Sequence, residues 1–89
     1  MKPTIGRVVL YRGKHGLHTL RPAIVVCTLD TLDPAGVEQG FIPPITSESH
    51  LHLHVFTPSA VGSFTEYDVA QSDDPLDPAP GTWVWPPRV

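Results

Sequence analysis

Hydrophobic residues occur in short runs along this chain, and glycine, proline or polar clusters separate one run from the next. Two early runs, Ile5–Tyr11 (IGRVVLY) and Ala23–Thr28 (AIVVCT), are rich in the β-branched residues that favour strands. Between them, Arg12–Leu20 (RGKHGLHTL) contains two glycines and two histidines and is too long for a tight turn. We therefore expect two strands joined by a candidate binding loop.

The segment His50–Phe56 (HLHLHVF) gives the clearest strand signal in the chain. Successive side chains of a strand point to opposite faces, so Leu51, Leu53 and Val55 share one face. The opposite face carries the three histidines His50, His52 and His54. This alternation predicts a third strand with one buried face.

Two later runs complete the predicted sheet. Val61–Val69 (VGSFTEYDV) alternates in part, which predicts a fourth strand. Thr82–Pro86 (TWVWP) predicts a short final strand with Trp83 and Trp85 on one face, ended by prolines.

Two long connections separate these strands. Residues 30–49 contain too many glycines and prolines for a regular element, so we expect a long excursion with a short extended piece at residues 41–42. Residues 73–81 (DDPLDPAPG) form an acidic, proline-rich connector that should be exposed and extended.

Composition agrees with a mostly β chain of one domain, residues 1–89. Its eleven prolines and seven glycines leave little room for long helices, in which proline costs about 3 kcal/mol and glycine about 1 kcal/mol. About five short strands with long loops predict an all-β fold, either a small SH3-like barrel or an open antiparallel sheet that dimerises. A chain of this length buries only roughly 60% of its unfolded surface, so we also expect a homo-oligomer.

Charge is distributed unevenly along the chain. The first 29 residues carry five of the six cations and no acid, whereas the remaining 60 carry nine acids and one arginine. The first part is therefore +5 and the rest −8, which gives the net charge of −3. A local basic surface on an acidic body suits a small anion better than a long phosphate backbone. The same charges are also compatible with solvated strand faces and loops.

The candidate ligand-binding residues combine these cations with aromatic rings. Arginine and lysine neutralise phosphate, and an aromatic ring can stack on a base for about 1 to 3 kcal/mol. Indoles also serve as core in a thin domain, and we expect this of at least one tryptophan. The predicted binding residues are Arg7, Tyr11, Arg12, Lys14, Arg21, Trp83 and Trp85.

Other chemistry is less well supported. Two histidines two residues apart on a strand can reach one metal, but no acid or cysteine accompanies them in sequence, so we favour a solvent-facing or interface role and predict no metal. Cys27, the only cysteine, lies in an apolar strand, where a thiol is normally a small buried hydrophobe. Because no nucleophile elbow, paired carboxylates or phosphate-binding glycine loop occurs, we predict a protein that is not an enzyme and needs no cofactor.

Four motifs occur in order along the chain: Ile5-Gly6-Arg7-Val8-Val9 with Tyr11, Arg21-Pro22-Ala23-Ile24-Val25, Leu53-His54-Val55-Phe56, and Ala79-Pro80-Gly81-Thr82-Trp83-Val84-Trp85-Pro86. This pattern resembles a group of short uncharacterised phage and prophage proteins that commonly read IGRxVHY, RAAIV, LxVF and PGTWHWP. The resemblance spans nearly the whole chain. Leu10 and Val84 depart from it, because a histidine is frequent at both places.

The resemblance implies a virus-encoded protein acting in the cytoplasm of a bacterial host, but it implies no activity. Small β-rich phage proteins include oligomeric sponges that sequester the cyclic nucleotide signals of bacterial immunity, and the likeness here is one of size and setting. We expect a non-catalytic binding protein for a small anionic nucleotide, with an anti-defence sponge as the sharpest form. The alternative is a small interaction module that binds a host or phage protein. Net acidity and the lack of a recognition helix argue against duplex DNA or RNA, and no apolar run approaches a membrane span.

Overall fold

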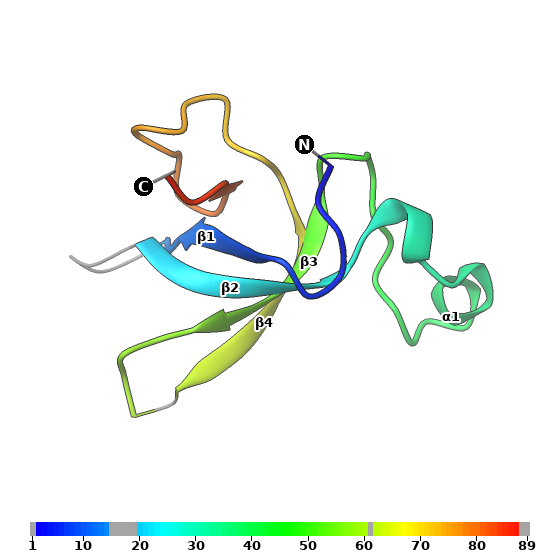
Figure 1. Cartoon of the computed structure of the whole chain (residues 1–89). Coiled ribbons are helices and arrows are strands. Elements are labelled where there is room, and N and C mark those ends of the chain that lie inside the picture. Colours follow the sequence, from blue (N-terminus) through cyan, green and yellow to red (C-terminus); the bar gives the residue numbers. More distant parts are fainter. Residues whose placement is uncertain (1, 15–19, 61, 88–89) are drawn as a thin grey trace.

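Five strands form one antiparallel sheet in the computed structural model, which describes residues 2–14, 20–60 and 62–87 (Figure 1). Their order across the sheet is β4-β3-β2-β1-β5. The strands are β1 (Val8–Arg12), β2 (Leu20–Cys27), β3 (Leu51–Phe56), β4 (Ser63–Val69) and β5 (Trp83–Val84). The all-β prediction is confirmed, and each predicted strand has its counterpart.

The sheet is open, so the barrel alternative is wrong. One parallel bridge joins Gln71, just after β4, to Trp83 of β5 at the opposite edge. Trp83 N donates to Ala70 O at 3.0 Å, and Ser72 N donates to Trp83 O at 2.9 Å. Because β4 itself pairs only with β3 among the described strands, this contact brings the two edges together without closing a barrel.

The core lies on one side of this sheet, which we call the inner face. Every strand contributes to it, as alternation along a strand requires. The buried cluster consists of Val9, Tyr11, Ala23, Val25, Leu51, Leu53, Val55, Val69 and Trp83, with Phe64 and Trp85 packed against it. The predicted burial of one face of β3 is therefore confirmed.

The opposite side, the outer face, is also largely apolar. Cross-strand pairs place Val8 opposite Ile24, and Leu10 opposite both Pro22 and Val84. A sheet face that meets water usually carries polar side chains at these alternate positions. The outer face therefore differs from an ordinary solvated surface.

The long excursion before β3 contains two short helical elements where an irregular chain was expected. These are a 3-10 turn at Leu29–Thr31 and helix α1 at Pro34–Glu38, which lies well away from the strands (Figure 1). Asp33 caps α1, since its Oδ1 accepts from Ala35 N at 3.1 Å, and proline at the first position suits a helix start. The extended piece expected at residues 41–42 is wrong, because both of their amides turn back to Gly36 O.

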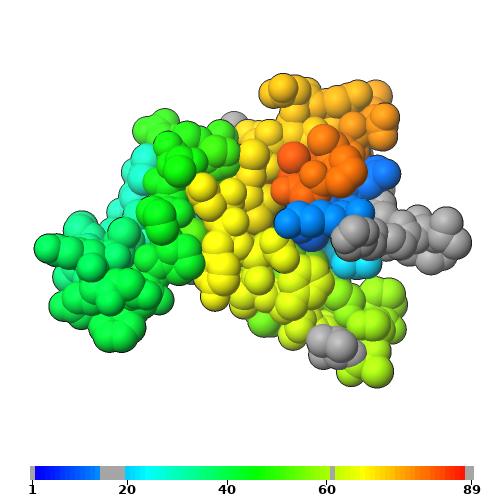
Figure 2. Space-filling model, turned by 180° about the vertical axis from the view of Figure 1, so that it is seen from behind, coloured from blue at the N-terminus to red at the C-terminus, as the bar shows by residue number. Residues whose placement is uncertain are grey.

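The two remaining connections are the acidic connector and the loop between β1 and β2. The acidic connector, residues 73–81, is mostly exposed as predicted, but bends at residues 73 and 75–77 fold it back rather than leave it extended. Seen from behind, β4 and the residues after it (yellow) run between the α1 region (green) and the connector (orange) (Figure 2). The candidate loop between β1 and β2 includes residues 15–19, which lie outside the described ranges.

Candidate functional site

A cleft of about 190 Å³ lies at one end of the inner face, lined by Tyr11, Lys14, Arg21, Phe64 and Glu66. Tyr11 of β1 is directly opposite Arg21 of β2, so their side chains leave the sheet on the same side. Phe64 is opposite the buried Val55, which places its ring on the inner face too. Sheet register therefore assembles this cleft from three strands.

Both the rings and the charges of the cleft are in mutual contact. The Tyr11 and Phe64 rings meet edge to face, with centroids 6.3 Å apart and planes at 78°. Lys14 Nζ lies 4.0 Å from Glu66 Oε2. The cleft thus has an aromatic floor and a rim with two cations and one carboxylate.

Tyr11 stays protonated in this setting. Burial raises the pKa of its hydroxyl above the ordinary value of about 10, and the negative charge of Glu66 raises that pKa further. The charge of Arg21 acts in the opposite direction and is the smallest of the three effects. The phenol is therefore neutral at physiological pH and keeps its ability to donate a hydrogen bond.

Four of the seven predicted binding residues lie elsewhere. Arg7 packs over the ring of Trp85, with its guanidinium carbon 5.4 Å from the ring centroid. Trp83 is fully buried, and its Nε1 donates to Ser49 O at 2.9 Å. Trp83 is therefore core and cannot stack on a ligand, whereas Trp85 is partly buried and meets it edge to face at 5.4 Å.

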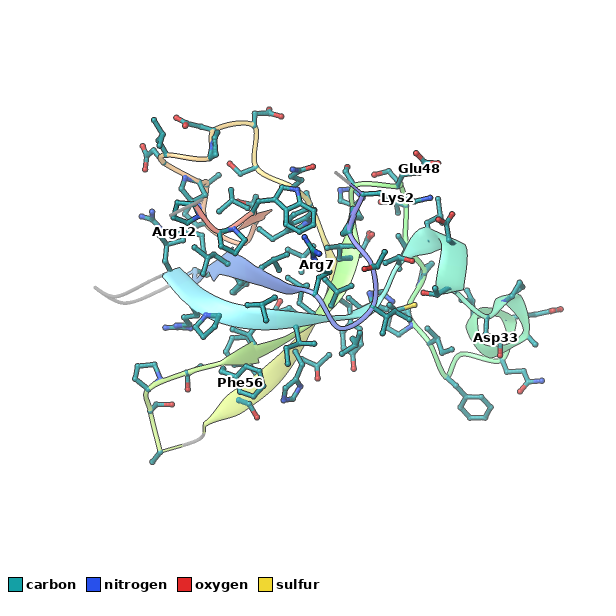
Figure 3. All side chains as sticks on the ribbon, viewed as in Figure 1. Lys2, Arg7, Arg12, Asp33, Glu48 and Phe56 are labelled. Carbon is teal, nitrogen blue, oxygen red and sulfur yellow. The ribbon has the colours of Figure 1, made fainter. Side chains whose placement is uncertain are left out.

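Arg12 is also separate from the cleft. It lies opposite Leu20 in the register, and alternation puts it on the outer face, away from Tyr11. Its Nη1 lies 3.9 Å from Asp77 Oδ1 of the connector. Arg7 and Arg12 lie at opposite ends of β1 (Figure 3), so the predicted site does not form as one unit.

Phe64 and Glu66 belong to the cleft but were not among the predicted binding residues. The alternation in β4 already places them together on one face, opposite Ser63 and Thr65. What the sequence lacks is the register between strands, which brings that face beside Tyr11 and Arg21.

His52 departs from the expectation for the histidines, because it is buried rather than facing solvent or an interface. Its Nδ1 accepts from Asp68 N at 3.0 Å, and its Nε2 lies 2.7 Å from Pro43 O. Since that carbonyl can only accept, Nε2 carries the proton. The Tyr67 ring packs on His52 edge to face at 5.1 Å.

The other two histidines, His50 just before β3 and His54 within it, have partners of their own. His50 Nδ1 lies 2.6 Å from Thr46 Oγ1 and 3.5 Å from Asp68 Oδ1. His54 Nδ1 lies 3.2 Å from Thr65 Oγ1. Within residues 2–14, 20–60 and 62–87, no group of three or more His, Cys, Asp or Glu side chains is placed to hold a metal ion.

No protein-family model matches this chain, and no curated protein and no solved structure is significantly similar to it. The resemblance to phage proteins thus stays a prediction from sequence motifs. In the described part of the chain, no helix has the length and apolar character needed to cross a membrane.

Proposed function

We propose that this protein binds a small anionic ligand of the nucleotide class without catalysing a reaction. The observation that carries the proposal is the convergence of Lys14 and Arg21 at a cleft floored by the Tyr11 and Phe64 rings. Phosphate recognition needs positive charge held near an apolar surface on which a base or sugar can rest. These are the groups that the cleft provides.

Each side chain has a defined role in this proposal. Lys14 and Arg21 neutralise the phosphate, and Lys14 exchanges its ion pair with Glu66 for the ligand's negative charge. The Glu66 carboxylate then accepts a hydrogen bond from the amino group of a base such as adenine, cytosine or guanine. Phe64 supplies the apolar contact for the base.

The size of the cleft limits the ligand. At about 190 Å³ it is smaller than the roughly 300 to 1,000 Å³ of pockets for drug-sized molecules. One cleft suits one nucleotide unit. A cyclic di- or trinucleotide sponge, the sharpest version of the proposal, would therefore engage one unit of the ligand per chain.

Isothermal titration calorimetry against cyclic mono-, di- and trinucleotides tests this proposal. We expect binding by the wild type and a loss of affinity of about ten-fold or more in Arg21→Ala, since a charge-assisted hydrogen bond contributes about 1.5 to 3 kcal/mol. Arg12→Ala is the matched control, because Arg12 lies on the outer face. No heat from any nucleotide, or equal losses in the two variants, would contradict the proposal.

A second candidate function, an interaction module for a host or phage protein, is favoured by the free edge of β4. Among the described residues, β4 is the last strand on its side of the sheet, and its backbone can accept an added strand from a polypeptide. Tyr67, on this strand, is half-exposed. This module would recover a polypeptide partner that Tyr67→Lys loses and Phe41→Lys retains, and nucleotides would leave its melting temperature unchanged.

A further inference from the structure

The outer face carries two adjacent rows of apolar side chains that run across the strands. One row joins the apolar Val8 and Ile24 and then ends in the polar His54 and Thr65, through directly opposed pairs. The other joins Val84 to Leu10 and Pro22, with Phe56 beyond them in the same hollow as Pro22. Val8 is 50% exposed and Phe56 40% exposed, so much apolar surface meets solvent in the single chain.

Charge is nearly absent from this face. In β1 the charged side chain that points outward is Arg12, which lies beside Asp77 at the margin of the face. Asp68, at the register irregularity of β4, lies 3.5 Å from His50 Nδ1 and accepts from Thr46 Oγ1. The solvated face of an antiparallel sheet normally carries polar side chains in alternation with the buried apolar ones. A face without them is typical of a surface that another protein covers.

Two hollows border the apolar rows, so the face is uneven rather than flat. One, of about 380 Å³, is lined by Leu20, Arg21, Pro22, Phe56, Thr57 and Pro58. The other, of about 440 Å³, is lined by Leu10, Leu20, Pro75, Leu76, Val84, Trp85, Pro86 and Pro87. Side chains that project beside hollows allow two copies of one surface to interlock.

We infer that the outer face is a homodimer interface, with the occupant a second copy of this chain. Two-fold pairing sets a patch against its own copy, so a patch that carries charge of a single sign repels itself. Because the outer rows carry no charge, self-pairing meets no such repulsion. The two sheets then pack face to face about 10 Å apart, and the exposed layer becomes the middle of a sandwich.

The size of the face sets the expected strength of the dimer. Four strand spacings of about 4.8 Å and strands of about six residues at 3.3 Å each give a footprint of roughly 400 Å² per chain. Two such footprints make about 800 Å² for both partners, which is below the roughly 1,200 to 2,000 Å² of standard specific interfaces and in the range of weak, transient ones. We therefore expect a dimer that dissociates on dilution, not a permanent one.

The proposed dimer face and the proposed ligand site lie on opposite faces of the sheet and share one residue, Arg21, which lines both the cleft and the smaller hollow. Tyr11 and Phe64 lie on the inner face, so the cleft stays open when two outer faces meet. Val8 and Phe56, which the dimer test changes, do not line the cleft, so loss of the dimer in those variants is distinguishable from loss of ligand binding. The two are measured separately.

Sedimentation velocity of the full chain over a concentration series from about 5 to 500 µM tests the inference. The wild type should move from monomer towards twice the chain mass of 9.7 kDa as concentration rises. Phe56→Lys and Val8→Lys should stay monomeric, because each buries a charge in the interface. Phe41→Lys, which changes a phenylalanine that is 79% exposed on the loop after α1, should dimerise like the wild type.

A wild type that stays monomeric at every concentration overturns the inference and leaves this face to a different protein. A dimer that survives both Phe56→Lys and Val8→Lys also overturns it, because the contact then lies elsewhere. Should these variants fail to fold, methyl NMR of the wild type decides. Dilution must then shift the Val8, Ile24 and Val26 signals, and shifts confined to other methyl groups count against the interface.

Discussion

His52 occupies the most constrained position of any polar side chain in the described core. The pairing register shifts by one residue on both sides of it, between Val25 and Cys27 in β2 and between Leu51 and Leu53 in β3 against β4. The irregularity in β4 lies where Asp68 N donates to His52 Nδ1, and the excursion before β3 supplies Pro43 O to Nε2. The imidazole thus satisfies two backbone groups that no strand partner pairs.

Replacing His52 should therefore cost far more than replacing its neighbour. We expect His52→Leu to lower the free energy of unfolding by about 2 to 4 kcal/mol, since it leaves two buried polar groups unpaired. His54→Leu removes the contacts with the Thr65 hydroxyl and the Phe56 ring at a partly buried position, leaves no buried backbone group unpaired, and should cost less than about 1 kcal/mol. Urea unfolding measures both values, and equal losses would contradict this account.

Tyr11 should make stability depend on alkaline pH. Its pKa is raised in the folded state, chiefly by burial, so folding favours the neutral phenol. That stabilisation is complete below the unfolded pKa of about 10 and is lost as the pH rises through the higher folded pKa. We expect urea midpoints of the wild type to fall more steeply between pH 9 and pH 11 than those of Tyr11→Phe, and parallel curves would refute this.

At the scale of elements, β5 stabilises more of the fold than its two residues suggest. Through Trp83 it pairs with Tyr11 of β1, bridges to Gln71 and donates to Ser49 O. Segments far apart in sequence therefore meet at this one residue, through its backbone at Tyr11 and Gln71 and through its indole at Ser49 O. Loss of this side chain should loosen both edges of the sheet together.

Trp83→Phe and Trp85→Phe form a matched pair that tests this role. The first leaves Ser49 O without its donor and opens a cavity in a fully buried site, so we expect a loss of about 2 to 4 kcal/mol in unfolding free energy. The second alters a partly buried ring with a cation contact from Arg7 and should cost about 1 kcal/mol or less. Chemical denaturation separates them, and the reverse order would disprove the assignment.

Alternation along the chain was enough to predict the strands, because β-branched runs and the regular pattern of β3 report a period of two directly. Helix α1 was missed although Asp33 followed by Pro34 is a helix-start signal, since Gly36 and Gly40 weigh against any helix. The register shifts beside His52 had no signal in the sequence. They depend on contacts between strands that only the fold creates.

The candidate site was predictable only in part for the same reason. Tyr11, Lys14 and Arg21 come together because one hairpin aligns them, and proximity in sequence already suggested it. Arg7 immediately precedes β1, and its carbonyl accepts from Val25 N of β2, yet its guanidinium packs on Trp85, far away in the chain. Charge counting cannot distinguish these two outcomes.

At the scale of the whole molecule, the protein consists of a central three-stranded region with peripheral additions. β2 pairs on both sides, with β1 and with β3, whereas α1 lies outside the sheet. The free energy needed to open a segment locally rises with its burial and its hydrogen bonding. Different parts of the chain should therefore exchange amide hydrogens at different rates. We expect the amides of Ala23 and Val25 to exchange most slowly and those of α1 and the connector fastest.

Native-state hydrogen exchange followed by NMR measures this gradient. Protection in β2 should approach the global free energy of unfolding, and protection in α1 should be small. Equal protection of α1 and β2 would show that the excursion before β3 unfolds with the sheet as one unit.

Trp83 and Trp85 touch edge to face but differ in burial, so their fluorescence can report on different events. Trp83 is shielded from water in the core, so its emission should change only when the chain unfolds. Trp85 borders the larger hollow of the outer face, where a docked chain would displace water from its ring. With a phenylalanine in place of either indole, intrinsic fluorescence can follow folding and assembly separately, without any attached dye.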